Sequence, residues 1–226
     1  MAASGALARP TRTPFLLLPL LAAVGALFLV GSPAQAQERP LALADPAINV
    51  PRTTAMDEAC SGAPQGACQL AVLEAMDSAR EAEGVGPLIL TPGYDNLSTA
   101  GQLLVLTDLE RVDRGLPGFT HLSSQLDRLS QKAALSNSDP DGPAGTTWGS
   151  NWAGGEASAL LADYDWMYDD GPGSPNLDCP RASASGCWDH RRIILGYYGS
   201  HPFMGAAATM VGGVTSMTEL LSSAPV

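Results

Sequence analysis

Residues 150–171 read SNWAGGEASALLADYDWMYDDG, and residues 186–195 read GCWDHRRIIL after a loop bounded by two cysteines. Apolar residues at helical spacing predict a helix over about 156–168, and a short helix is expected from Asp189. All four tryptophans of a chain with 6% aromatic residues lie in or just before this stretch. We therefore expect it to form two helices around an aromatic centre, with a pinned loop between them.

The rest of the chain places helices first and strands last. The spacing of apolar residues predicts helices from about Cys68 to Gly84, Thr99 to Gly115 and Leu122 to Ala133. The segments 203–211 and 218–221 are typical of strands joined through Gly212-Gly213. No alternation of strands with helices is present, so we predict an α+β domain with helices packed on a small antiparallel sheet.

The N-terminal residues have the features of a signal peptide. Arg9 and Arg12 precede the apolar run 15–30, and Ala34-Gln35-Ala36 supplies the small residues of a cleavage site. We expect residues 1–36 to be removed and the protein to be secreted, with an uncleaved N-terminal anchor as the alternative. No second long apolar run follows, so no membrane span is expected after cleavage.

Three further regions are expected after the signal peptide. Residues 37–58 are rich in proline and alanine and predict an extended or disordered lead-in. Residues 59–96 are predicted to form an N-terminal helical extension with a disulfide-closed loop. Residues 97–226 are expected to form the main domain.

The charge balance excludes some partners. The chain has 12 Lys and Arg against 23 Asp and Glu, for a net charge of −11. An acidic protein of this kind is not expected to bind nucleic acid or anionic lipid headgroups, because both need a concentrated basic surface. Lys132 is the only lysine, and this arginine-rich, alanine-rich usage suggests a bacterial genome rich in G and C.

The four cysteines form two local pairs, and the members of each pair are eight residues apart. Of three possible connectivities, Cys60–Cys68 with Cys179–Cys187 is the simplest, and disulfides suit an exported protein. A zinc–thiolate site is the competing interpretation, but the C-x₂-C spacing typical of such sites is absent.

Common catalytic motifs are missing. The chain has no G-x-S-x-G, no phosphate-binding G-x-x-x-x-G-K, no H-E-x-x-H and no dinucleotide fingerprint. A Ser-His-Asp triad stays open, although no pattern selects one serine. Because all four cysteines are most simply paired, a cysteine nucleophile is not expected.

Three ionisable residues remain as candidates for a site. Glu156 is expected at the start of a helix, where the helix dipole favours an anion. Asp169 is expected at the end of the same helix with Asp170 beside it, and this unfavourable pair needs a compensating partner or solvent. His190 begins the following helix, where a hydrogen bond to the loop is the simpler role.

Several segments together resemble the CAP superfamily, the extracellular domain of cysteine-rich secretory proteins, antigen 5 and pathogenesis-related class-1 proteins. Residues 106–117 (LTDLERVDRGLP) resemble its first helix, and 126–134 resemble the helix that follows. The segment 152–156 (WAGGE) is similar to the family's G-E-N element, 166–169 (WMYD) to W-x-x-E, and 190–195 (HRRIIL) to H-R-x-N-I-L. The resemblance implies a three-layer α-β-α sandwich.

The resemblance also implies a cleft with two histidines and two acids that binds a divalent cation in some members. Glu156 and Asp169 correspond to the acids, and His190 to the second histidine. The first histidine is missing, because residues 136–155 contain none. Asp139, Asp141 or Asn151 could take its place. Zn²⁺ or Ca²⁺ would then have Glu156, Asp169 and His190 as ligands.

Three functions follow as hypotheses. The first is a binding module that holds a small amphipathic molecule or a cell-envelope component in a cleft around Glu156, Asp169 and His190. The second is a cell-envelope hydrolase that uses the same acids and histidine, with or without a metal. The third is a structural domain in which these residues line no cavity. The chain is not assigned as an enzyme. Residues expected to complete the cleft are Trp152, Trp166, Tyr168, Trp188 and Arg191.

Overall fold

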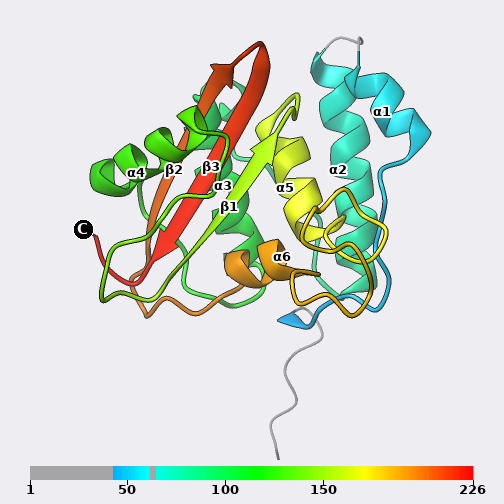
Figure 1. The fold of residues 1–226 in the computed structure, drawn as a ribbon. Helices are drawn as coiled ribbons and strands as arrows, with labels where there is room; N and C mark the ends of the chain where they lie inside the picture. Colours follow the sequence, from blue (N-terminus) through cyan, green and yellow to red (C-terminus); the bar gives the residue numbers. More distant parts are fainter. Residues whose placement is uncertain (1–42, 62–64, 226) are drawn as a thin grey trace, which may run out of the picture. The chain divides into compact units, whose positions relative to one another are not determined.

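The computed structural model describes residues 43–61 and 65–225, all of which belong to the unit Glu38–Val226 (Figure 1). The predicted signal peptide 1–36 lies outside the described residues. The elements in chain order are α1 (Thr54–Cys60), α2 (Gln65–Ala82), the short 3₁₀ helix η2 (Tyr94–Asn96), α3 (Thr99–Val112), α4 (Ser124–Leu135), β1 (Trp148–Gly154), α5 (Ala159–Met167), α6 (Asp189–Ile194), β2 (Phe203–Val211) and β3 (Val214–Ser222).

The three strands form one antiparallel sheet in the order β1-β3-β2. The predicted hairpin of β2 and β3 is confirmed, and its turn residues Gly212 and Gly213 have φ of 61° and 87°. Two consecutive positive φ values are what a tight hairpin turn requires, and glycine adopts them without a steric penalty. The predicted α+β class is therefore confirmed.

Three elements were not predicted: the short 3₁₀ helix η2, strand β1 and helix α1. Strand β1 reads WGSNWAG, and its glycine, serine and asparagine residues are depleted in strands, so its local signal is weak. Helix α1 begins at Thr54, inside the range expected to be extended or disordered, and the Thr53 side chain caps it by accepting from the Met56 amide. Strand β1 borders the candidate site described below, and the segment just before α1 contacts its acids.

Helices α4 and α3 cover opposite faces of the sheet. Gly205 of β2 lies against the backbone of α4 at Leu126, where an added Cβ would come within 2.3 Å of the Leu126 carbonyl carbon. The cross-strand partner of Gly205 is Leu220 of β3. Glu219, the residue before Leu220, accepts a hydrogen bond of 2.6 Å from the Thr107 hydroxyl of α3. Because successive side chains of a strand point to opposite faces, α3 and α4 lie on the two sides of the sheet.

Helix α5 runs through the hydrophobic core. Every residue of the helix except Asp165 is buried, and Ser158 caps it by accepting from the Leu161 amide at 3.2 Å. The predicted start at Glu156 is therefore wrong by three residues: Glu156 precedes the cap and does not lie in the first turn. The Glu156 carboxylate is therefore stabilised by an ion pair with Arg52 and not by the expected helix dipole.

Both predicted disulfides, Cys60–Cys68 and Cys179–Cys187, are present. The second closes a loop against Trp188, which is 6% exposed and packs on this disulfide. The backbone N–H of Trp188 donates to the Asp170 carbonyl at 3.0 Å, so the loop is joined to the end of α5. In the described part of the chain, no helix is long and apolar enough to cross a membrane.

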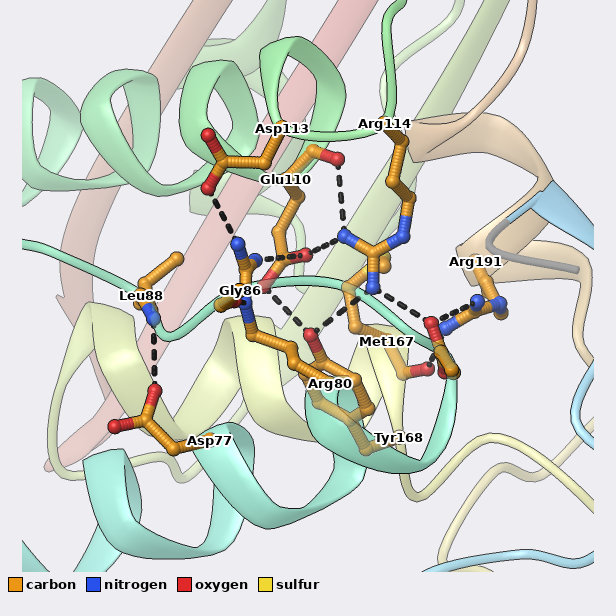
Figure 2. A network of polar contacts seen from close by, with 11 residues as sticks. Asp77, Arg80, Gly86, Leu88, Glu110, Asp113, Arg114, Met167, Tyr168 and Arg191 are labelled. Atoms are coloured by element: carbon orange, nitrogen blue, oxygen red, sulfur yellow. Dashed lines mark hydrogen bonds and ion pairs between the residues drawn. The ribbon is translucent and has the colours of Figure 1, made fainter. Parts of the chain in front are cut away.

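A buried network of charges joins helix α2 to α3, α5 and α6 (Figure 2). Arg80 of α2 is fully buried and donates to Glu110 at 2.7 Å, to the Gly86 carbonyl at 2.7 Å and to Asp113. Arg114 also pairs with Glu110, and Tyr168 donates to that carboxylate at 2.8 Å. Since Arg80 has no exposed surface, α2 is part of the same core as the sheet-covering helices.

Candidate functional site

The candidate site is a cavity of about 480 Å³ beside strand β1, the edge strand of the sheet next to α5 and α6. Its wall comes from five places: 137–139 after α4, 152–154 and Glu156 at the end of β1, 165–166 and 169–170 at the end of α5, 175–178 just before the Cys179–Cys187 loop, and His190 of α6. Because these segments are distant in sequence, the cavity exists only in the folded chain.

A smaller cavity of about 220 Å³ lies beside the Cys60–Cys68 disulfide and is lined by Tyr94 and Ser158, among others. None of the predicted site residues lines it. The larger cavity has about twice its volume, and it brings Glu156, Asp169 and His190 together. We therefore take the larger cavity as the candidate site, and all three of these residues line it.

Glu156 and Asp169 are both held by the segment that precedes helix α1. The guanidinium of Arg52 pairs with Glu156 and also with Asp165, where its Nε donates at 2.8 Å. The side-chain amide of Asn49 donates to Asp169, and the backbone N–H of Arg52 donates to the same carboxylate at 3.3 Å. Part of the cavity's negative charge is therefore neutralised by the chain itself.

His190 is oriented by Asp170. Its Nδ1 lies 2.7 Å from a carboxylate oxygen of Asp170, and because an ionised carboxylate can only accept, Nδ1 carries the proton. Burial by itself would lower the pKa of His190, but this hydrogen bond and the nearby charges of Asp170 and Asp139 outweigh it, and the pKa is raised. Nε2 is then the nitrogen available to accept a proton whenever the ring is neutral.

The acids at the end of α5 have different partners. Asp169 is held by the segment before α1, whereas Asp170 accepts from His190, from Asn176 at 2.6 Å and from the Arg191 amide at 3.3 Å. The expected compensation of this like-charged pair is therefore supplied by hydrogen bonds from three separate segments of the chain.

The cavity is strongly acidic. Six carboxylic residues belong to its wall: Asp139, Glu156, Asp165, Asp169, Asp170 and Asp178. Burial raises the pKa of Asp165 to about 7, and the charges of Glu156 and Asp169 act in the same direction against the opposing effect of Arg52. Burial also raises the pKa of Asp139, against the opposing effect of the nearby His190. Burying these negative charges is therefore energetically unfavourable, and a ligand that is cationic or donates hydrogen bonds would offset this unfavourable free energy.

Trp152 and Trp166 supply apolar wall, as predicted for these two tryptophans. The indole N–H of Trp152 donates to the Ser216 hydroxyl at 2.9 Å, and that of Trp166 donates to the Trp152 carbonyl at 3.3 Å. Trp166 is 2% exposed, whereas Trp152 is half-buried. With their N–H groups satisfied, the rings present apolar surface.

Three predicted cleft residues do not line the cavity. Tyr168 is fully buried, and its hydroxyl belongs to the Glu110 network. Trp188 packs on the Cys179–Cys187 disulfide. Arg191 is 1% exposed and donates to the Met167 carbonyl and to Glu83. Arg191 follows His190 in the sequence but points away from the cavity, because a helix turns consecutive side chains to different sides.

The residues present do not fit the divalent metal that the family resemblance implies. Among residues 43–61 and 65–225, no group of three or more His, Cys, Asp or Glu side chains is arranged to hold a metal ion. Glu156 is paired with Arg52, Asp169 accepts from Asn49, and the Nδ1 of His190 bonds to Asp170. Each predicted ligand already has a protein partner, so no step is assigned to a metal.

Of the residues considered for the missing histidine, only Asp139 lines the cavity. Asp141 is exposed, and Asn151 is fully buried, donating to Glu219 at 2.8 Å and to the His190 carbonyl at 3.3 Å. Sequence reasoning did not identify Asn49, Arg52 or Asp178. Since Arg52 and Glu156 are 104 residues apart, no local pattern indicates their contact.

Comparison with protein-family models, with curated proteins and with solved structures finds no match to this chain.

Proposed function

We propose that this protein is a secreted CAP-like binding module that holds a small amphipathic molecule, or a component of the cell envelope, in the 480 Å³ cavity. The observation that carries the proposal is the meeting of apolar walls and carboxylates in one hollow of suitable size. The two disulfides support an extracellular location. The placement of α3 and α4 on opposite faces of the sheet supports the three-layer CAP-like arrangement.

The residues of the wall indicate which part of the cavity would hold the polar group of such a ligand and which part would hold its apolar body. A phosphate or carboxylate group would be repelled by the six acidic residues, whereas an ammonium group or a set of hydroxyls would be bound. Trp152 and the exposed Leu177 offer contact to an apolar body. The ligand class is therefore an amphipathic molecule whose polar end donates hydrogen bonds or carries positive charge.

The first prediction uses dodecylamine and dodecanoate as probes, each below its critical micelle concentration. Dodecylamine should bind, with a change in tryptophan fluorescence, and dodecanoate should bind at least about tenfold more weakly, because a charged hydrogen bond contributes about 1.5–3 kcal/mol. Asp139→Asn should weaken dodecylamine binding about tenfold. Asp141→Asn, two residues away and outside the cavity, is the matched control and should leave binding unchanged. Equal binding of the two probes, or no binding of either, would contradict the proposal.

A second function, hydrolysis of cell-envelope material, is favoured by the hydrogen bond of 2.7 Å between His190 and Asp170. A carboxylate that holds Nδ1–H leaves Nε2 as a general base in the neutral ring. Because the pKa of His190 is raised, the base is protonated at low pH and becomes active as the pH rises through that pKa.

If the cavity is hydrolytic, His190→Gln should lower the turnover of labelled cell-wall fragments by about 10²–10⁴-fold, the usual contribution of a general base. The rate of the unaltered protein should rise with pH, and this rise should be absent in the variant. His121→Gln is a suitable control, since His121 is exposed and outside the cavity. Turnover that is unchanged in His190→Gln would exclude this function for the site.

A further inference from the structure

The segment 49–52, named the strap here, crosses the end of α5 that borders the cavity. The side-chain oxygen of Asn49 accepts from the Gly171 amide at 2.7 Å. The backbone of Val50 donates to the Tyr168 carbonyl at 3.0 Å and accepts from the Tyr164 hydroxyl at 2.9 Å. The strap is therefore attached to the end of α5 by both backbone and side-chain hydrogen bonds.

At the end of the strap, Arg52 is in contact with three acids of the cavity wall. Its guanidinium pairs with Glu156 and Asp165, and its backbone N–H donates to Asp169. The side chains are 22% exposed for Arg52, 16% for Glu156 and 13% for Asp165, so these pairs are only weakly screened by water. Arg52 itself is not among the residues that line the cavity, whereas Glu156 and Asp165 are.

Two further acids of the wall, Asp139 and Asp178, do not pair with Arg52, whose ion pairs are with Glu156 and Asp165. The charges of Asp139 and Asp178 help to raise the pKa of His190. Asp170 is engaged by His190 and Asn176. Among the acidic residues of the cavity, Glu156 and Asp165 are thus paired with Arg52, whereas Asp139 and Asp178 are not.

We propose that Arg52 is a specificity-determining residue of this site: because it pairs with Glu156 and Asp165, a single cationic group of the ligand is directed to Asp139 and Asp178. A cavity without Arg52 has a second place for positive charge and accepts a dication. The proposal rests on the proposed binding function, since it concerns which end of the same cavity receives the ligand's polar group.

The first arm of the test keeps Arg52 in place. Asp139→Asn should lower the affinity for dodecylamine about tenfold, and Glu156→Gln should lower it clearly less, because the Glu156 carboxylate is already paired with Arg52. Glu156→Gln leaves Arg52 paired with Asp165, so the strap retains an ion pair. A loss of affinity in Glu156→Gln as large as that in Asp139→Asn would overturn the proposal.

The second arm removes the charge of Arg52. Arg52→Met keeps a side chain of similar length, and it should bind the terminal diamine of dodecane about tenfold or more tightly than the unaltered protein does. The gain should disappear in the double variant Arg52→Met/Glu156→Gln. Arg192→Met is the matched control, because Arg192 forms exposed pairs with Asp45 and Asp189 away from the cavity. No gain for the diamine in Arg52→Met would overturn the proposal.

A third readout needs no amphipathic ligand. Low guanidinium chloride, compared with sodium chloride at equal ionic strength, should raise the melting temperature of Arg52→Ala by refilling the place between Glu156 and Asp165. The unaltered protein should show no such rise. Rescue without any dodecylamine binding would contradict the proposed function alone, whereas dodecylamine binding without rescue would contradict the role of Arg52 alone.

Discussion

Arg80→Ala should lower the free energy of unfolding by about 3–5 kcal/mol, the usual cost of removing one partner from a buried ion pair. Arg80 and Glu110 both have 0% exposed side chains, so the remaining carboxylate cannot recover hydration. Arg114 and Tyr168 still contact Glu110, but the buried cluster loses one of its positive charges and the Gly86 carbonyl loses its donor (Figure 2). Urea denaturation with both disulfides intact measures the effect.

Two variants separate the charge of Arg80 from its packing. Arg80→Met keeps most of the side-chain volume, and it should lose nearly as much stability as Arg80→Ala if the charge dominates. Arg192→Ala removes an exposed pair, in which Arg192 is 44% exposed, and it should change stability by less than about 1 kcal/mol. A small loss in Arg80→Met together with a large one in Arg80→Ala would show that packing, not charge, holds α2 in place.

Gly205→Ala should lower the free energy of unfolding by about 1–3 kcal/mol or more through overpacking between β2 and α4. The added Cβ would lie 2.3 Å from the Leu126 carbonyl carbon and 2.6 Å from the Asp127 nitrogen. These are backbone atoms of a helix, so the contact cannot be relieved by turning a side chain. The Asp127 carboxylate also accepts from the Ala206 amide at 3.1 Å, and a shift of α4 would weaken that bond.

The control for this prediction is Gly66→Ala in the first turns of α2. An added Cβ at Gly66 meets nothing within 4 Å, and alanine favours a helix over glycine by about 1 kcal/mol. The control should therefore be neutral or stabilising in the same urea experiment. Equal stability of Gly205→Ala and the unaltered protein would contradict the close packing of α4 on the sheet.

Much of the fold could be predicted because its signals are local. Helix α3 begins at Thr99 as expected, although its cap is Ser98, whose hydroxyl accepts from the Gly101 amide. The hairpin followed from Gly212-Gly213, and the disulfides from the spacing of the cysteines. Strand β1 was missed because it pairs with β3 some 70 residues later, and this pairing stabilises a sequence that has little strand preference of its own.

The candidate site was predicted in part. Glu156, Asp169 and His190 were selected from their positions at the ends of expected helices, and all three line the cavity. Tyr168 and Arg191 were expected in the cleft because they neighbour these residues in sequence, yet both side chains point into the buried network. Proximity in sequence grouped three residues that line one cavity, but it did not determine which neighbouring side chains face that cavity.

The sequence by itself determined most of the helices, the β2–β3 hairpin and the two disulfides, because periodicity, glycine pairs and cysteine spacing act over a few residues. Only the tertiary structure decided the partners of the acidic residues. Arg52 reaches Glu156 across 104 residues, Asn49 reaches Asp169 across 120, and Asp170 reaches His190 across 20. Such contacts form because burying a carboxylate requires a counter-charge or donor, and only the folded chain brings that partner within reach.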